Sequence, residues 1–363
     1  MRGYMDRAVF GDADAPIHFG DPFGEQLEYE SGRALAVLGP AGVVRVSGPD
    51  TASWLTTISS QVLTGHAQGD SQEMLILDPN GRVEFAVGVI HDADGVWLLV
   101  EPDGAEALVE FLESMKFMSR VEIQNLSAEY QLFGTVGRLT TEVPTWEDPW
   151  PGVSEGGARY HQGKHPAEET RLVNYLVTNQ DADSFVEQLG LPLAGSMAAE
   201  ATRIAAWRPR QSAEVDDRAL PAELDWLRTA VHTTKGCYRG QESVARILNL
   251  GKPPRRLTFL QLDGSRGDLP PAGSPVELNG RQVGVLTSVA RHAEMGPIGL
   301  ALLKRGLDPD ATLDIGEIAA AQELIVPIDG KSDHSPEERP GAGLRRLDHG
   351  GRDIRTRGPG AGN

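Results

Sequence analysis

The residues best suited to chemistry lie in one short segment, Lys235-Gly236-Cys237-Tyr238-Arg239-Gly240-Gln241-Glu242, which holds the only cysteine of the chain. Positive charge from Lys235 and Arg239 would favour the thiolate, which is the reactive form of a cysteine. Gly236 and Gly240 indicate a loop rather than a helix interior. A single intracellular cysteine is more often a small buried apolar residue, and that alternative stays open. The polar neighbours of Cys237 favour a functional thiol about as strongly.

A short helix is expected directly after Gly240. Glu242 suits its first turn and can pair with Arg246 one turn later. Gly251 is placed to end this helix. The sequence therefore predicts a loop that presents Cys237 at a helix start, where free backbone N–H groups can bind an anion. Gln241 and Glu242 could hydrogen-bond a ligand or could only cap the helix.

The charge distribution is uneven along the chain. The formal net charge of −18 disfavours a sequence-independent nucleic-acid partner. Residues 235–256 nevertheless carry six lysines and arginines against one glutamate. This basic stretch suggests a small anionic ligand, with the alternative that its cations cap helices or are solvated.

Composition excludes several classes of protein. A single cysteine cannot form a disulfide framework or a self-contained metal or iron–sulfur site. No apolar run is long enough for a membrane span, and Met1 to Pro16 lacks the apolar centre of a signal peptide. We expect a cytoplasmic protein without a membrane partner.

The first half of the chain alternates strands and helices. A helix beginning near Asp50 and another over Ala105 to Met118 separate apolar strands, and Asp78-Pro79-Asn80-Gly81 is a strong hairpin turn. The expected strands are Val43–Ser47, Met74–Leu77, Val83–Ile90, Val96–Val100, Val121–Ile123 and Tyr130–Val136. This order is typical of a ferredoxin-like α+β unit.

The second half continues after a long Pro- and Gly-rich loop over 137–170. We expect a strand at Leu172–Val177, and helices at Asp183–Leu189, Ser196–Trp207 (with Arg203) and Pro221–Val231, with a loop at Pro209–Leu220. From Arg255 onward, short strands indicate a small β-barrel. Residues 329–363 are charged, rich in Gly and Pro, and expected to be disordered.

The Cys237 segment resembles the signature of the YgfZ-type folate-binding proteins, which are relatives of the glycine cleavage T-protein (aminomethyltransferase). Further stretches support this resemblance: Val44–Asp50 with Trp54-Leu55, Leu77–Val83, Ala201–Ile204 and Pro221–Val231. The resemblance implies a cloverleaf of two ferredoxin-like α/β subdomains and a C-terminal barrel. The corresponding boundaries are 1–253, divided near 137–170, then 254–328 for the barrel and 329–363 for the tail.

The resemblance also implies a tetrahydrofolate pocket floored by the hairpin from Asp78 to Val87. Tyr238 could stack on the ligand or pack in the core, and Arg203 could meet the folate carboxylates or pair with an internal acid. The residues expected to contact folate are Tyr238, Arg239, Gln241, Glu242, Arg246, Arg203, Asp78 and Asn80, while Lys235 would tune the Cys237 thiol.

Two departures from the T-protein pattern bear on activity. An acid of the strand after the hairpin turn is replaced by Phe85 or Ala86, and strand alternation would turn Glu84 to the other face. A second acid, after the helix arginine, is replaced by Ala205. Because pterin N–H groups need acceptors, aminomethyl transfer is disfavoured.

The leading hypothesis is a tetrahydrofolate-binding accessory factor that assembles or repairs iron–sulfur enzymes, its transient protein clients, through Cys237. One thiol can supply a single cluster ligand to a client or exchange with a disulfide. The alternatives are a folate-dependent aminomethyltransferase or demethylase, and a thiol-redox protein that does not bind folate.

Overall fold

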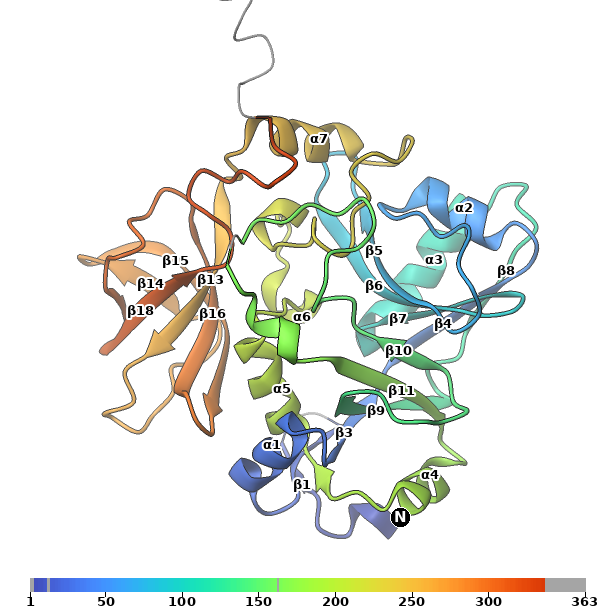
Figure 1. Ribbon diagram of the computed structural model, residues 1–363, viewed down its shortest axis with the longest axis horizontal. Helices are drawn as coiled ribbons and strands as arrows, with labels where there is room; N and C mark the ends of the chain where they lie inside the picture. Colours follow the sequence, from blue (N-terminus) through green and yellow to red (C-terminus); the bar gives the residue numbers. More distant parts are fainter. Residues whose placement is uncertain (1–2, 12–13, 162, 337–363) are drawn as a thin grey trace, which may run out of the picture.

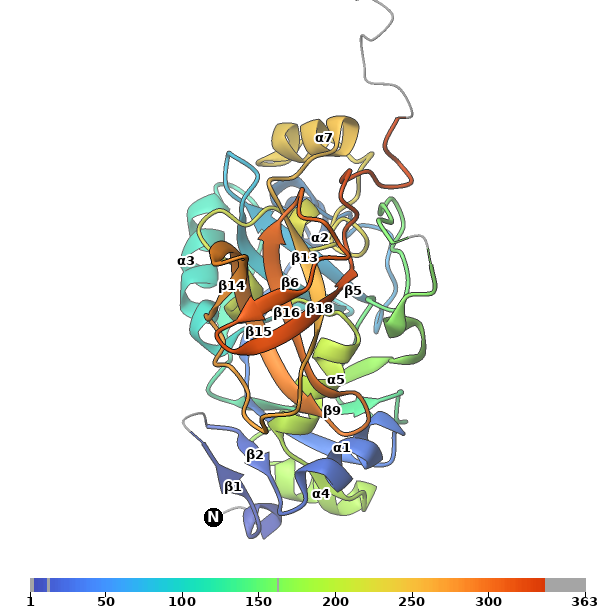
Figure 2. The same ribbon diagram turned by 90° about the vertical axis from the view of Figure 1, so that its left-hand side faces the viewer.

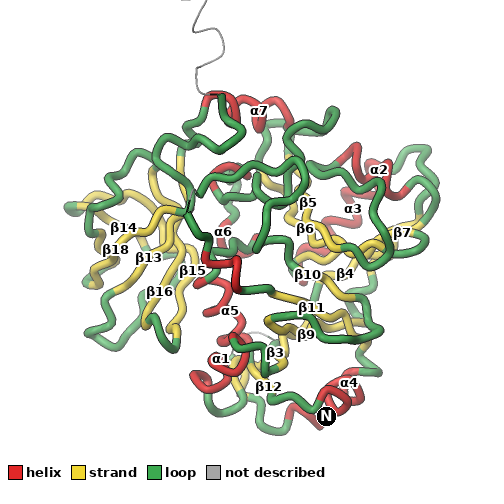
Figure 3. The backbone as a smooth tube through the Cα atoms, in the orientation of Figure 1, coloured by secondary structure: helices red, strands yellow, loops and turns green. Residues whose placement is uncertain are grey.

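The computed structural model describes residues 3–11, 14–161 and 163–336. In this part of the chain, two five-stranded sheets and a closed barrel surround a central core, and a two-stranded ribbon of β1 (Val9–Phe10) and β2 (Pro16–His18) follows the short 3-10 helix η1 (Gly3–Met5). Figure 1 shows the barrel on one side of the molecule, and Figure 3 shows that long loops fill much of the centre. The predicted α+β class is confirmed.

The first sheet is antiparallel and has the order β5-β6-β7-β4-β8. Its strands are β4 (Gly42–Ser47), β5 (Ser71–Leu77), β6 (Val83–His91), β7 (Gly95–Val100) and β8 (Glu122–Asn125), and η2 (Pro102–Gly104) leads into the second of its two helices, α2 (Thr51–Ile58) and α3 (Ala105–Met115). Met74 and Ile76 pack in the cluster that holds these helices, whereas Leu75 and Leu77 join the central core. Strand β5 is apolar on both faces because both faces are covered.

The second sheet interlocks with the first in the sequence. Its order is β10-β11-β9-β3-β12, so the chain enters it with β3, leaves for the first sheet, and returns with β9. The strands are β3 (Leu35–Pro40), β9 (Tyr130–Val136), β10 (Thr145–Glu147), β11 (Leu172–Thr178) and β12 (Leu193–Ala194). The accompanying helices are α1 (Pro22–Glu30), α4 (Ala182–Leu189) and α5 (Ser196–Ala205).

The closed barrel faces the viewer in Figure 2. Its strand order is β13-β16-β15-β14-β17-β18. Its strands are β13 (Arg255–Leu262), β14 (Pro275–Leu278), β15 (Arg281–His292), β16 (Gly296–Lys304), β17 (Leu313–Ile315) and β18 (Ile318–Leu324). Asn279 and Gly280 between β14 and β15 both have positive φ (50° and 72°), which is the conformation of a two-residue hairpin turn of the Asn-Gly type. Before the barrel, α7 (Gln241–Leu250) ends at Gly251 as predicted.

The predicted helix over Pro221–Val231 is wrong. Only a short 3-10 turn, η4 (Pro221–Glu223), forms there, and Asp225 takes a positive φ of 58°. Residues 221–231 are buried on every side, so this segment has no exposed face. Its carbonyls instead accept from the loop before β11, with Ala158 N donating to Leu227 O (2.8 Å). Tertiary pairing therefore overrides the apolar spacing that predicted a helix.

Smaller differences concern loops and helix ends. The helix predicted to reach Trp207 ends at Ala205 and has Gly195 as its N-cap. The predicted loop at 209–220 contains α6 (Gln211–Glu214), and the loop at 137–170 contains β10 and η3 (Pro166–Glu169). Of the predicted disordered tail, residues 329–336 pack on the protein, whereas 337–363 lie outside the described residues. None of the helices in the described part combines the length and apolar character that a membrane crossing needs.

Candidate functional site

Cys237 lies in the loop between Val231 and α7, and it is exposed and not oxidised to a disulfide. Gly240 is the N-cap of α7 and adopts a left-handed conformation with φ of 81°. The predicted loop that presents a thiol beside a helix start is therefore confirmed. The roles of its neighbours depend on what each side chain contacts.

Lys235 holds this loop against α2. Its ammonium donates to the carbonyl oxygens of Thr56, of Ser59 (2.5 Å) and of Gln61 (3.1 Å), which uses all three N–H donors at the end of that helix. Burial lowers the pKa of Lys235 to about 8, so the group remains an ammonium at neutral pH. Its position explains how the loop is anchored, because cations at helix C-termini complete the last carbonyls.

Tyr238 and Arg239 connect the cysteine loop to the body of the protein. Tyr238 is half-buried against the central core, and burial raises the pKa of its hydroxyl. Arg239 donates to Glu84 Oε2 at 2.8 Å, and its guanidinium lies 5.7 Å from the centre of the Phe111 ring. Arg239 therefore spans from the cysteine loop to both β6 and α3.

The Asp78–Gly81 turn packs directly on the start of α7. A Cβ atom on Gly240 would lie 2.6 Å from Asp78 O and 2.8 Å from Gly81 Cα, so only glycine fits. Within the turn, Asp78 accepts from the backbone N of Asn80 (2.7 Å) and of Arg82 (2.8 Å). Desolvation acts to raise the pKa of Asp78, but these hydrogen bonds outweigh it and hold the pKa below its ordinary value. Asp78 and Asn80 are thus engaged within the turn that supports the cysteine loop.

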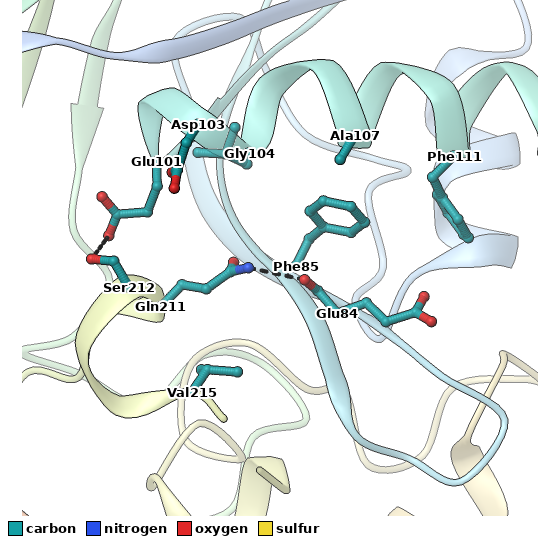
Figure 4. A pocket seen from close by; sticks show the side chains of 11 residues that line it. Glu84, Phe85, Glu101, Asp103, Gly104, Ala107, Phe111, Gln211, Ser212 and Val215 are labelled. Atoms are coloured by element: carbon teal, nitrogen blue, oxygen red, sulfur yellow. Dashed lines mark hydrogen bonds between the residues drawn. The ribbon is translucent and has the colours of Figure 1, made fainter. Parts of the chain in front are cut away.

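A cavity of about 640 Å³ opens beside this assembly. Figure 4 shows it between α3, strand β6 and the α6 region. Its lining consists of Glu84, Phe85, Val100, Glu101, Asp103, Gly104, Ala107, Phe111, Gln211, Ser212 and Val215, and we call it the acidic pocket. Phe85 and Phe111 form its aromatic side, with ring centres 6.1 Å apart. Three carboxylates and two aromatic rings suit a flat ligand that is rich in N–H donors.

A β-bulge places Glu84 in this pocket. Strand β6 pairs Phe85 with Ile76 and Val83 with Leu77, which leaves Glu84 as the extra residue. Gln211 holds the bulge, because its side-chain amide donates to Glu84 O (2.9 Å) and accepts from Ala86 N (2.7 Å). Strict strand alternation predicted opposite faces for Glu84 and Phe85, and this prediction is wrong because a bulge breaks the two-residue period.

Arg203 pairs with internal acids, which is the second of the two alternatives predicted for it. It is buried, donates to Glu200 Oε2 at 2.9 Å, lies 3.2 Å from Glu214 Oε2, and donates to Ser288 Oγ at 2.6 Å. These contacts join α5 to α6 and to the barrel. Desolvation opposes the charged form of Arg203, but the two carboxylates outweigh it and raise its pKa. Glu101, which lines the acidic pocket, adds a weaker electrostatic interaction, but the hydrogen bonds of Arg203 go to residues outside that pocket.

The remaining predicted residues lie on α7 or just beyond it. Gln241 is half-buried at the first position of the helix, while Glu242 and Arg246 are exposed. In the part of the chain that the structure describes, the expected pair between Glu242 and Arg246 does not form. Arg255, at the other end of the basic stretch, binds Asp216 and Glu223. The basic stretch is therefore largely divided among structural contacts.

Sequence reasoning missed most of the acidic pocket. Glu101, Asp103, Phe111, Gln211 and Ser212 come from three separate elements and belong to no motif. Glu101 accepts from Ser212 Oγ at 3.1 Å, which closes one wall (Figure 4). The only available signal was the pair of acids around Pro102 at the junction of a strand and a helix.

No family model matches the chain. A chloroplastic protein of Arabidopsis thaliana that is named as a transferase is 23% identical over 293 residues, which cover 76% of this chain and 66% of that protein. The tRNA-modifying protein YgfZ of Edwardsiella ictaluri is 26% identical over 80% of this chain and 90% of its own length. YgfZ of Pectobacterium atrosepticum is 25% identical over a match that covers 85% of this chain and 95% of its own length.

A solved structure extends the comparison to the fold. The glycine cleavage system aminomethyltransferase T of Bartonella henselae superposes with a TM-score of 0.68 at 15% identity, covering 91% of this chain and 96% of the other. A likeness at this identity concerns the fold alone. The predicted T-protein-like architecture, with its barrel at the C-terminal side, is confirmed.

Proposed function

We propose that this chain, which is similar to the YgfZ proteins and has the aminomethyltransferase fold, binds tetrahydrofolate and serves iron–sulfur enzymes as an accessory factor, through the thiol of Cys237. The folate would occupy the acidic pocket, and the thiol would meet a transient client protein beside it. We expect this activity in the cytoplasm.

The observation that carries the proposal is the lining of the acidic pocket. Its volume of about 640 Å³ lies within the range of small-ligand sites. A pterin ring would stack between or beside Phe85 and Phe111, and its amino and ring N–H groups would donate to Glu84 or Glu101. These carboxylates would replace the two acids of the T-protein pattern that this chain lacks, one at Phe85 or Ala86 and one at Ala205. Arg239, at the edge of the pocket, would attract the negatively charged tail of the folate.

The same arginine supports a link between folate and the thiol. Arg239 is two residues from Cys237 and is paired with Glu84, which lines the pocket. A ligand that competes for either partner would alter how the cysteine loop is held. Cys237 itself could give one ligand to a cluster in the client, or exchange with an oxidised sulfur there, because a single thiol cannot hold a cluster.

The YgfZ relatives are named as tRNA-modifying proteins. A net charge of −18 opposes association with a polyanion, since RNA binding depends on cationic contacts to phosphates. We therefore propose that this chain contributes to such modification through a protein client and not by binding tRNA. A gel-shift titration with tRNA at low salt tests this, and a retarded complex at micromolar protein would contradict it.

A second candidate function is a folate-dependent aminomethyltransferase or demethylase. It is favoured by the bulge that returns a carboxylate, Glu84, to the pocket wall. A reconstituted glycine cleavage system in which this protein replaces T-protein distinguishes the two candidates. We expect no turnover there, and measurable turnover would favour the enzyme.

Titration calorimetry with tetrahydrofolate tests the main proposal. We expect binding at micromolar concentration or tighter, and about tenfold weaker binding for Glu84→Gln or Glu101→Gln, because each change removes one charged acceptor. Glu106→Gln is the matched control, since Glu106 lies exposed on α3 outside the pocket. Absence of heat with the unmodified protein would refute folate binding.

The role of the thiol needs a separate measurement. We expect Cys237→Ser to bind tetrahydrofolate as tightly as the unmodified protein but to lose complementation of iron–sulfur enzyme activity in a strain that lacks its own YgfZ. Full complementation by the variant would mean that the thiol does not act.

A further inference from the structure

A group of buried polar side chains lies apart from the acidic pocket. Tyr160, His165, Asp225 and Arg228 have only 1%, 4%, 0% and 3% of their surface exposed. They come from the loop before β11 and from the irregular segment after η4. The Arg228 guanidinium stacks on Trp150, with Cζ 4.3 Å from the ring centre. We call these four residues the buried polar group.

The hydrogen-bonding atoms of this group are not satisfied by one another. Among the described residues, no hydrogen-bond partner contacts Tyr160 Oη, His165 Nε2, either carboxylate oxygen of Asp225, or Nε and Nη2 of Arg228. Arg228 Nε is 3.3 Å from Asp225 Oδ2 but is not aligned for a hydrogen bond, and His165 Nε2 is 3.9 Å away. Since His165 Nδ1 accepts from Ala167 N, Nε2 carries the proton of the neutral ring.

The neighbouring buried carboxylate of Glu73 is fully bonded, because it accepts from Arg208 Nη2 (2.6 Å), Trp226 Nε1 (3.2 Å) and Thr229 Oγ1 (2.7 Å). Among the described residues, Nη1 of Arg208 also has no hydrogen-bond partner, and the Arg208 guanidinium lies over the same Trp150 ring as that of Arg228. Unmet hydrogen-bonding capacity is therefore concentrated in and next to the buried polar group. Buried polar atoms in proteins are nearly always hydrogen-bonded, and ordered water supplies the partner where the chain does not.

We propose that the buried polar group is a binding site for a small cluster of ordered water molecules. The group offers both donors and acceptors, as water requires. Arg228 Nε lies 3.3 Å from Asp225 Oδ2, so a small anion or a metal cation would meet groups of both kinds, whereas water can donate to one and accept from the other.

Two members of this site, Asp225 and Arg228, lie in the segment of the chain that leads to Cys237. Arg228 O accepts from Ser154 N (3.0 Å), and Thr233 N donates to Gly156 O (2.8 Å), so one loop runs alongside the segment from Arg228 to Thr233. On its outer side, Asp333 pairs with the backbone of Arg159, next to Tyr160. Bound water would connect Tyr160 and His165, in the loop before β11, to Asp225 and Arg228, whose side chains they do not contact through direct hydrogen bonds among the described residues.

A crystal structure of the full chain, at a resolution that shows ordered water, tests the site directly. We expect water within hydrogen-bond distance of Asp225 and of Arg228, together with Tyr160 or His165. Direct hydrogen bonds between these side chains, with no water between them, would overturn the proposal.

Oxygen-17 magnetic relaxation dispersion tests it in solution, because it counts water molecules with long residence times. We expect Tyr160→Phe to lose about one long-lived water per molecule, since its hydroxyl has no partner among the residues that the structure describes. Tyr175→Phe is the matched control: that buried hydroxyl accepts from Leu139 N at 2.7 Å and lies 3.1 Å from Thr135 Oγ1. An unchanged count for Tyr160→Phe, or an equal loss for both variants, would overturn the proposal.

Discussion

The cysteine loop and the buried polar group differ in how their charges are satisfied. In the loop, which is exposed around Cys237, Lys235 uses all its donors on carbonyls, and Arg239 is paired with Glu84. In the buried polar group, Asp225 and Arg228 touch but leave most of their hydrogen-bonding atoms without a partner from the described chain. Buried charged groups usually form more of their possible hydrogen bonds than exposed ones, and these two regions show the opposite.

This difference distinguishes charged groups that stabilise the fold from groups that are free to bind other molecules. Lys235 and Arg239 both hold the loop, and the thiol of Cys237 is the exposed group available to a client protein. The two positive charges that flank the thiol in the sequence, Lys235 and Arg239, therefore act mainly in holding the structure. In the buried polar group, by contrast, unmet hydrogen bonds mark a place where molecules other than the chain must contribute. Three kinds of variant test whether the two regions differ in this way.

The largest effect is expected at Gly240. In Gly240→Ala, the added methyl would meet Asp78 O at 2.6 Å, and the backbone would keep a φ of 81° that disfavours alanine. We expect a loss of about 3 kcal/mol in the free energy of unfolding, measured by urea denaturation. Gly236→Ala is the matched control on the other side of Cys237, because no atom lies within 4 Å of its added Cβ. Equal losses for the two variants would show that the contact with the Asp78 turn does not hold the loop.

The buried polar group should reveal itself in the pH dependence of stability. Burial raises the pKa of Asp225 to about 7 and lowers the pKa of His165 to about 3. Between about pH 4 and 6.5, folding thus favours a proton on Asp225 and disfavours one on His165. Asp225 alone makes stability fall as pH rises in this window, whereas His165 alone makes it rise. The two contributions oppose each other, in a field set also by Arg228, Arg159, Asp333 and His161.

Asp225→Asn removes one side of this balance. We expect the free energy of unfolding of the variant to rise with pH by up to about 1.4 kcal/mol per unit more than that of the unmodified protein, between pH 4 and 6.5. Urea unfolding across this range measures the slope. Asp217→Asn provides the control, since the Asp217 side chain is 83% exposed. Parallel curves for the unmodified protein and Asp225→Asn would indicate that Asp225 is ionised normally in the fold.

Local signals made much of the architecture predictable. The Asp78 turn, the end of α7 at Gly251 and the barrel hairpin at Asn279 each depend on residues adjacent in sequence. The acidic pocket does not depend on such local signals, because its walls come from five elements, β6, β7, η2, α3 and α6. Glu84 reaches the pocket through a β-bulge, which the spacing of apolar residues does not reveal. In the sequence, Asp225 and Arg228 look like an ordinary ion pair three residues apart. That their hydrogen-bonding atoms lack partners among the described residues depends on how the surrounding loops fold, which no local pattern indicates.

The smallest effect is expected at the thiol itself. If the cations hold the loop and the thiol does not, Cys237→Ser should change the free energy of unfolding by no more than about 0.5 kcal/mol, as for other exposed sites. Lys235→Met is the contrasting variant, because it leaves the carbonyls of Thr56, Ser59 and Gln61 without their donor. The same urea titrations measure both. A larger loss for Cys237→Ser than for Lys235→Met would reverse the assignment, making the sulfur part of the scaffold and leaving Lys235 as the group available for chemistry.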